Sequence, residues 1–172
     1  MVKKNAIFFD RDGVLIKAPV DQHNKPKSIK TYDQIEWADN INKICSFYKK
    51  NYYLIMVTNQ PDVTRKVNSL KNVKRINAEI KKKLDLDDIF VCYCDDTCSN
   101  RKPNPGMILN AKKKYNLDLK KCYFIGDRWR DVEASYNAGC ESILLDYNYN
   151  EEIKIKPNFK IKNLKEIYGI IK

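Results

Sequence analysis

The sequence has no long apolar segment. Its hydrophobic runs, such as Tyr52–Val57, are far shorter than the roughly 20 residues that a membrane-spanning helix requires. The beginning of the chain also lacks the uninterrupted apolar region of a secretory signal peptide. Internal repeats, low-complexity segments and long linkers are missing as well. We therefore expect a single domain over residues 1–172, soluble and cytoplasmic, that is long enough to bury a hydrophobic core.

Histidine and arginine are scarce. The one histidine, His23, stands in a polar stretch without a partner, and six arginines stand against 27 lysines. The net charge of +11 favours a phosphorylated or polyanionic ligand. Most lysines are scattered as on a solvated surface, whereas five of the six arginines fall in or just after four short motifs described below. Because arginine suits bidentate phosphate recognition, this local charge indicates a small anionic substrate at least as well as nucleic acid.

Six cysteines occur in a chain without a signal peptide, which argues against a disulfide framework. Three of them stand among apolar residues and are expected in the core: Cys45, Cys122 and Cys140. The other three form a cluster just before the third motif: Cys92, Cys94 and Cys98.

Apolar runs alternate with segments of helical periodicity. Strands are expected at 4–9, 52–57, 89–92, 121–125 and 142–145. Helices are expected at 33–49, 68–84, 104–115, 132–138 and 164–171, with Asn104 as an N-cap and Gly139 as a C-cap. Residues 14–31 are expected to form a loop. The alternation predicts an α/β fold, a Rossmann-like three-layer sandwich with a mainly parallel sheet.

Polar residues follow four of these strands. They are Asp10 and Asp12 in IFFDRDGVL, Thr58 in MVTNQ, Lys102 in RKPNPG, and Asp127 and Asp131 in FIGDRWRD. The carboxyl ends of parallel strands meet at one edge of a sheet, and ligands bind there. We therefore expect these side chains to converge on a single site.

A carboxylate can act as a nucleophile toward phosphorus and form an aspartyl-phosphate, which water then hydrolyses. Asp10 is the candidate nucleophile. Because an anionic nucleophile must approach an anionic phosphate, Mg²⁺ is the expected cofactor, held by Asp10 and Asp127 with Asp131 nearby.

The leaving oxygen also needs a proton. Asp12 is the candidate acid and base, on a turn that Gly13 makes sharp. Thr58 could donate a hydrogen bond to the transferring phosphate, and Lys102 could neutralise its oxygens. Each motif alone has an ordinary structural explanation, such as a turn, a strand end or a helix cap. The four together, in this order, indicate one catalytic site.

The motifs DRDGV, VTNQ, RKPNPG and GDRWRD resemble those of the haloacid dehalogenase superfamily of phosphohydrolases, over residues 6–145. Within it, TNQ and RKPxPGM resemble the histidinol-phosphatase and heptose-bisphosphate phosphatase group. The resemblance implies Asp10 as nucleophile, Asp12 as acid and base, and Mg²⁺ on Asp10, the Asp12 carbonyl and Asp127, with Asp131 in support. It also implies phosphate or substrate contacts from Thr58, Asn59, Gln60, Arg101, Lys102 and Arg128.

One segment departs from this pattern. Relatives carry a zinc loop with Cys-x-His and Cys-x-Cys before RKP, whereas here Asp96 replaces the histidine and Asn100 replaces the last cysteine. Asparagine is a poor zinc ligand, and Cys92 could substitute only by leaving its strand. We therefore expect structural thiols rather than Zn²⁺, with Cys92, Cys94 and Cys98 as the ligands if zinc is bound.

The intervals between the motifs leave no room for a separate cap domain. We expect an open pocket shielded by the loops at 17–31 and 94–100, which would hold the specificity. The favoured substrate is a small phosphorylated metabolite, most of all a sugar phosphate of the heptose bisphosphate type, turned over by a monomer or small homo-oligomer.

Three alternatives remain. One is histidinol phosphate as the substrate. Another is a polynucleotide 3′-phosphatase, which the charge would suit but the dispersed lysines and the missing aromatic groove argue against. The last is a non-catalytic phosphate-binding or scaffold protein.

Overall fold

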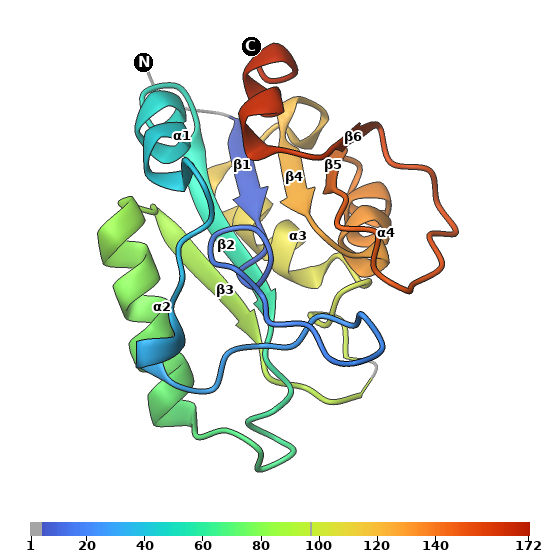
Figure 1. The fold of residues 1–172 in the computed structure, drawn as a ribbon. Helices are drawn as coiled ribbons and strands as arrows, with labels where there is room; N and C mark the ends of the chain where they lie inside the picture. Colours follow the sequence, from blue (N-terminus) through green and yellow to red (C-terminus); the bar gives the residue numbers. More distant parts are fainter. Residues whose placement is uncertain (1–4, 97) are drawn as a thin grey trace.

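The computed structural model describes residues 5–96 and 98–172. Its centre is a six-stranded sheet, entirely parallel, with the strand order β3-β2-β1-β4-β5-β6 (Figure 1). The strands are β1 (Ala6–Phe9), β2 (Tyr53–Asn59), β3 (Asp88–Cys92), β4 (Tyr123–Gly126), β5 (Glu141–Leu145) and β6 (Phe159–Ile161). The α/β prediction with a parallel sheet is therefore confirmed, and no cap domain is evident in the described residues.

Helices cover both faces of the sheet. The helices α1 (Ile41–Tyr48) and α2 (Leu70–Leu84) share one core with the 3₁₀ helix η3 (Leu164–Gly169). The helices α3 (Gly106–Tyr115) and α4 (Trp129–Ala138) build a second core on the opposite face, behind the sheet in Figure 1. Two short 3₁₀ helices complete the list, η1 (Tyr32–Gln34) and η2 (Leu119–Lys121).

The strand β1 lies at the middle of the sheet and is buried on both sides. All four of its side chains have no exposed surface. Ile7 and Phe9 enter the core beneath α1 and α2, whereas Ala6 and Phe8 enter the core beneath α3 and α4. A strand buried on both faces is apolar throughout, which explains why this run was readable from the sequence.

Several element boundaries differ from the prediction. The expected helix at 33–49 begins only at Ile41, because residues 36–38 pair with the loop after β1: Lys17 N–H donates to the Glu36 carbonyl (2.7 Å) and Ala38 N–H to the Leu15 carbonyl (3.2 Å). Pro105, rather than Asn104, is the N-cap of α3.

The C-terminal region also departs from expectation. The strand β6 was not predicted, because three residues at a sheet edge carry no usable periodicity. The final segment is the 3₁₀ helix η3 instead of an α-helix. The C-cap at Gly139 is confirmed, with φ +79°. In the described part of the chain, no helix has both the length and the apolar character needed to cross a bilayer.

The loops that follow β1, β2 and β3 gather at one end of the sheet, at the bottom of Figure 1. The register places Phe9 beside Met56 of β2 and beside Ile125 of β4. The residues that follow β1, β2 and β4 therefore emerge next to one another, and this edge of the sheet carries the motifs.

The central position of β1 leads to a stability prediction. We expect Phe8→Ala to lower the free energy of unfolding by about 3–5 kcal/mol, because it removes a fully buried ring that packs edge-on against Phe124. The matched control is Phe47→Ala, whose ring is 61% exposed, with an expected loss below about 1 kcal/mol. Urea denaturation measures both. Equal losses would contradict the placement of β1 at the centre of the fold.

Candidate active site

A small pocket of about 60 Å³ opens at the carboxyl end of the sheet. It is lined by Asp10, Asp12, Pro26, Lys27, Ser28, Thr58, Asn59, Lys102, Arg128 and Arg130. Residues from all four motifs thus come together, although the sequence separates them widely. The loop at 17–31 contributes three of the lining residues, in agreement with its expected shielding role. The described residues of the loop at 94–100 do not line this pocket.

Three aspartates form a buried cluster beside the pocket. Carboxylate oxygens of Asp10, Asp127 and Asp131 all lie within 4.8 Å of one another. Burial raises the pKa of Asp127 well above its ordinary value, and the charges of Asp10 and Asp131 raise it further. Burial likewise raises the pKa of Asp131. Among the described residues, no donor meets hydrogen-bond geometry with either carboxylate oxygen of Asp127, although the Tyr149 hydroxyl lies near it.

Two glycines make room for this cluster. A Cβ atom on Gly13 would lie 2.0 Å from Oδ2 of Asp127, and one on Gly126 would lie 2.1 Å from the Cβ of Asp131. Gly13 also has φ +91°, a conformation that side chains disfavour. Both positions therefore require glycine because the carboxylates occupy the space.

Lys102 is the cation at the base of the site. Its ammonium lies 2.9 Å from Oδ1 of Asp10 and 2.7 Å from Oδ1 of Asp131, and it donates to the carbonyl of Val57 at 3.0 Å. Burial alone would lower the pKa of Lys102, but Asp10 and Asp131 raise it. One ammonium cannot balance three carboxylates, so the donor set fits a divalent cation held by oxygen ligands.

Asn59 fixes the backbone that carries Lys102. Its amide donates to the Lys102 carbonyl at 3.0 Å, and its side-chain oxygen accepts from the Lys102 N–H at 3.1 Å. Asn59 lines the pocket as well. The sequence prediction of a substrate contact at Asn59 is untested, while this paired hydrogen bond indicates a positioning role.

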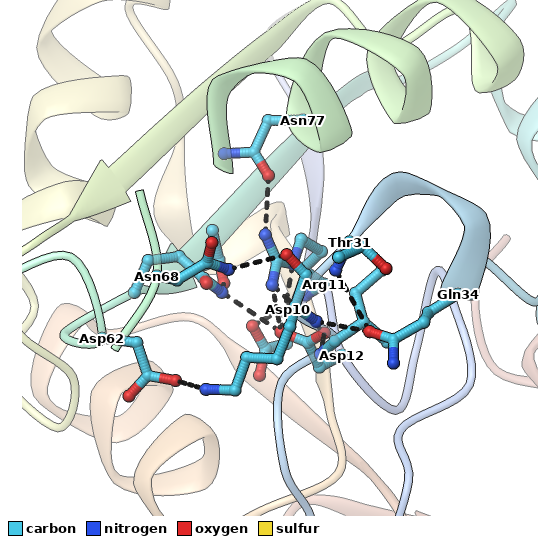
Figure 2. A network of polar contacts seen from close by, with 12 residues as sticks. Asp10, Arg11, Asp12, Thr31, Gln34, Asp62, Asn68 and Asn77 are labelled. Atoms are coloured by element: carbon cyan, nitrogen blue, oxygen red, sulfur yellow. Dashed lines mark hydrogen bonds and ion pairs between the residues drawn. The ribbon is translucent and has the colours of Figure 1, made fainter. Parts of the chain in front are cut away.

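Asp12 sits in a network of donors (Figure 2). Its Oδ2 accepts from Nε of Arg11 at 3.0 Å and from the amide of Gln60 at 3.1 Å. Gln60 also donates to the Thr58 hydroxyl oxygen at 3.0 Å. Arg11 is completely buried and reaches across to Asn77 of α2 at 3.0 Å. Arg11 therefore orients Asp12 instead of contacting a phosphate, a role that the sequence did not reveal.

The two arginines predicted to contact substrate already have protein partners. Arg128 forms a two-pronged ion pair with Glu151, in which Nε donates to Oε2 at 3.0 Å and Nη2 pairs with Oε1. Arg101 donates from Nη1 to the carbonyl of Cys94 at 2.5 Å. Only Arg128 of the two lines the pocket. Glu151 carried no signal in the sequence, because it belongs to a polar segment between β5 and β6.

Arg130 is a pocket-lining residue that sequence reasoning missed. It stands in the first turn of α4, and its Nε is buried without a hydrogen bond among the described residues. The spacing of Arg128 and Arg130 in GDRWRD is the only signal that could have identified it.

The cysteine cluster differs from the expected set of free thiols. Cys94 and Cys98 form a disulfide, and the sulfur of Cys92 lies 3.4 Å from that of Cys98. Cys92 makes this contact as the last residue of β3. The expectation that it could act as a ligand only by leaving its strand is therefore wrong, because Cys98 lies against it. All three sulfurs lie within 4.8 Å of one another and could hold a soft metal ion such as Zn²⁺. A disulfide and a metal site would be alternative states of Cys94 and Cys98.

A second and larger cavity, about 410 Å³, lies elsewhere, beside the start of the loop at 17–31. Its walls include Lys17, Tyr147, Tyr149 and Leu164. None of the motif residues lines it, although one of its wall residues, Tyr149, has its hydroxyl near Asp127.

The sequence matches the family model described as polynucleotide kinase 3 phosphatase over residues 5–158. A D-glycero-alpha-D-manno-heptose-1,7-bisphosphate 7-phosphatase of Campylobacter jejuni is 33% identical over 178 residues, covering 99% of this chain and 98% of the relative. A D-glycero-beta-D-manno-heptose-1,7-bisphosphate 7-phosphatase of Pasteurella multocida is 30% identical, covering 98% and 97% of the two chains.

The fold is shared with a solved relative. The crystal structure of D,D-heptose 1,7-bisphosphate phosphatase from B. bronchiseptica, complexed with magnesium and phosphate, matches with a TM-score of 0.80 at 24% identity over 97% of each chain. Together with the family match and the curated relatives, this establishes both the fold and the class of enzyme. The chain belongs to the polynucleotide kinase 3 phosphatase family, in the haloacid dehalogenase superfamily and the group of the heptose 1,7-bisphosphate phosphatases, and is a phosphoric monoester hydrolase.

Proposed function

We propose that this phosphatase hydrolyses a sugar bisphosphate of the heptose 1,7-bisphosphate type through an aspartyl-phosphate on Asp10, with Mg²⁺ as cofactor. The observation that carries the chemistry is the buried cluster of Asp10, Asp127 and Asp131, which has one lysine as counter-ion and two unpartnered oxygens on Asp127. Such an arrangement is unfavourable by itself and becomes favourable when a divalent cation binds.

When bound, Mg²⁺ would be held by Asp10, Asp127 and the Asp12 carbonyl, with Asp131 in support, and would supply the positive charge that lets one anion approach another. Lys102 adds charge of the same sign and fixes Asp10 through its 2.9 Å contact. Asn59 in turn holds the Lys102 backbone in place. These residues orient the nucleophile before the substrate arrives, so little reorganisation is needed during the reaction.

In the first half-reaction, a carboxylate oxygen of Asp10 attacks phosphorus while the bond from phosphorus to the sugar oxygen breaks. Asp12 gives its proton to that oxygen, so the sugar leaves as an alcohol. Thr58 accepts a hydrogen bond from Gln60, which leaves its hydroxyl proton free to donate to a phosphoryl oxygen. Each of these groups lines or borders the same small pocket.

In the second half-reaction, water attacks the phosphorus of the aspartyl-phosphate and the bond to the Asp10 oxygen breaks. Asp12 takes the proton of the attacking water and is then ready for another cycle. Arg11 and Gln60 hold its carboxylate as an acceptor, which is the geometry that receiving a proton requires. Inorganic phosphate is the second product.

The choice of a sugar bisphosphate rests on the curated relatives, two of which are named as heptose-1,7-bisphosphate 7-phosphatases at 30–33% identity. Two other substrates remain in view. A bifunctional histidine biosynthesis protein of Buchnera aphidicola is 27% identical over 83% of this chain and 41% of that protein. The family description names a polynucleotide phosphatase, whereas the relatives at 30–33% identity are named as heptose bisphosphate phosphatases.

A substrate comparison tests this choice. We expect kcat/KM for heptose 1,7-bisphosphate to exceed the values for histidinol phosphate and a 3′-phosphorylated DNA duplex by at least about tenfold, because two arginines line the pocket and favour a second phosphate. Phosphate release with Mg²⁺ measures all three. A higher value for DNA, falling steeply with salt, would replace the sugar bisphosphate with a polynucleotide substrate.

The metal proposal predicts a change in stability that does not depend on turnover. Saturating Mg²⁺ should raise the Tm by about 5–10 °C, because binding to the native state alone stabilises it. Asp127→Asn should remove this shift and raise the metal-free Tm, since it keeps the size of the side chain and removes a charge that burial, Asp10 and Asp131 disfavour. Calorimetric scans with and without Mg²⁺ make the measurement.

Asp39→Asn is the matched control for the metal test, because this carboxylate is 85% exposed and lies outside the cluster. It should keep the full Mg²⁺ shift. An unchanged shift in Asp127→Asn would remove that residue from the metal site.

A further inference from the structure

The cationic side chains that line the pocket differ in one respect, which is whether a carboxylate already neutralises them. Lys102 is paired with Asp10 and Asp131, and Arg128 is paired with Glu151. Lys27, on the loop that faces them, lies 3.0 Å from a carboxylate oxygen of Asp21.

Arg130 is the exception. No described residue forms a hydrogen bond or an ion pair with its guanidinium, which lies 5.5 Å from the ring of Trp129. Its Nε is buried within the protein without a partner. A buried donor without an acceptor is costly, so an anionic ligand that accepts from Nε would be stabilised there.

Arg130 is surrounded by charges of both signs. Burial lowers the pKa of Arg130, and so does the nearby charge of Arg128, whereas the charges of Asp131, Asp10 and Asp127 raise it. Burial, followed by the charge of Arg130, lowers the pKa of Arg101 in the same way. Arg101, Arg128 and Arg130 therefore lie near one another, and the aspartate cluster is also within electrostatic reach of Arg130.

The pocket offers a substrate two sets of donors. Thr58 and Lys102 lie with Asp10, where the phosphoryl group is transferred, and they supply its donors. Arg130 stands in the first turn of α4, near Arg128, and its Nε has no acceptor among the described residues. A guanidinium binds a phosphate through two parallel hydrogen bonds, which fixes its orientation as well as its charge.

We propose that Arg130 binds an anionic group of the substrate other than the phosphoryl group transferred to Asp10, and that it thereby selects bisphosphates over monophosphates. This inference rests on the proposed sugar bisphosphate activity and deepens it. Arg128, held by Glu151, forms the wall beside this second anion, and Arg130 supplies the free donors.

The test compares two substrates that differ only in the second phosphate, heptose 1,7-bisphosphate and heptose 7-phosphate. We expect Arg130→Gln to lower kcat/KM for the bisphosphate by about 10- to 100-fold, mainly through KM, and for the monophosphate by less than about threefold. Arg130→Lys should recover part of the loss, because it restores the charge without the planar fork. Steady-state phosphate release in Mg²⁺ supplies all of these values.

Arg75→Gln is the control, since Arg75 is an exposed arginine of α2 that lies against Tyr32, outside the pocket. It should leave both substrates unaffected. Equal losses on both substrates in Arg130→Gln would overturn the proposal and assign Arg130 to the transferred phosphoryl group or to the fold. Equal wild-type kcat/KM for the two substrates, or no loss on either in the variant, would overturn it as well.

Failure of the proposed function has a separate signature, which is a wild-type protein that releases no phosphate from either substrate. Equilibrium binding then decides the role of Arg130. Titration calorimetry with heptose 1,7-bisphosphate and Mg²⁺ should show at least about tenfold weaker binding to Arg130→Gln than to the wild type. Equal affinities, or no binding to either protein, would overturn the proposal.

Discussion

Excess negative charge buried at the end of a parallel sheet is the constraint on which this active site depends. Three carboxylates lie within 4.8 Å of one another, and a single lysine, Lys102, is paired with two of them. Burying charge without full compensation is costly. The fold must therefore hold these carboxylates in place until a cation neutralises them. Several features of the molecule serve that purpose.

The sheet supplies the first of these features. The order β3-β2-β1-β4 places the nucleophile strand between the strands that carry Thr58 and Asp127. Helices on both faces bury β1 completely, so the position of Asp10 is fixed by the core. Gly13 and Gly126 then leave the space that two carboxylates fill. Packing thus determines where the charges lie, and the charges determine what the site can bind.

A second group of contacts orients the reacting side chains from behind. Asn59 holds the backbone of Lys102, and Arg11 connects Asp12 to Asn77 on α2. Glu151 performs the corresponding task for Arg128. These side chains come from separate parts of the chain, and each restricts a residue that reaches the pocket. Preorganisation of this kind lets the charges that stabilise a transition state be in place beforehand.

Sequence reasoning identified the central strands and all four motifs, because buried strands and strand-end polar residues leave local patterns. Asp10, Asp12, Thr58 and Lys102 were found in this way and do lie together. It missed Glu151, because an ion pair across 23 positions depends on how two segments meet in space.

Other misses have the same origin. The role of the fully buried Arg11 was not predicted, since the sequence does not show that α2 places Asn77 within its reach. The helix expected from residue 33 begins later, because pairing with the loop after β1 overrides a local helical pattern. Tertiary contacts therefore decided what local periodicity left open.

The most direct test of the account is the kcat of Asp10→Asn for Mg²⁺-dependent phosphate release from heptose 1,7-bisphosphate. Loss of the nucleophile should lower kcat by at least about a thousandfold, while the metal-free Tm stays within about 3 °C of the wild type. A variant with kcat within about tenfold of the wild type would contradict the assignment of Asp10, and with it the aspartyl-phosphate route.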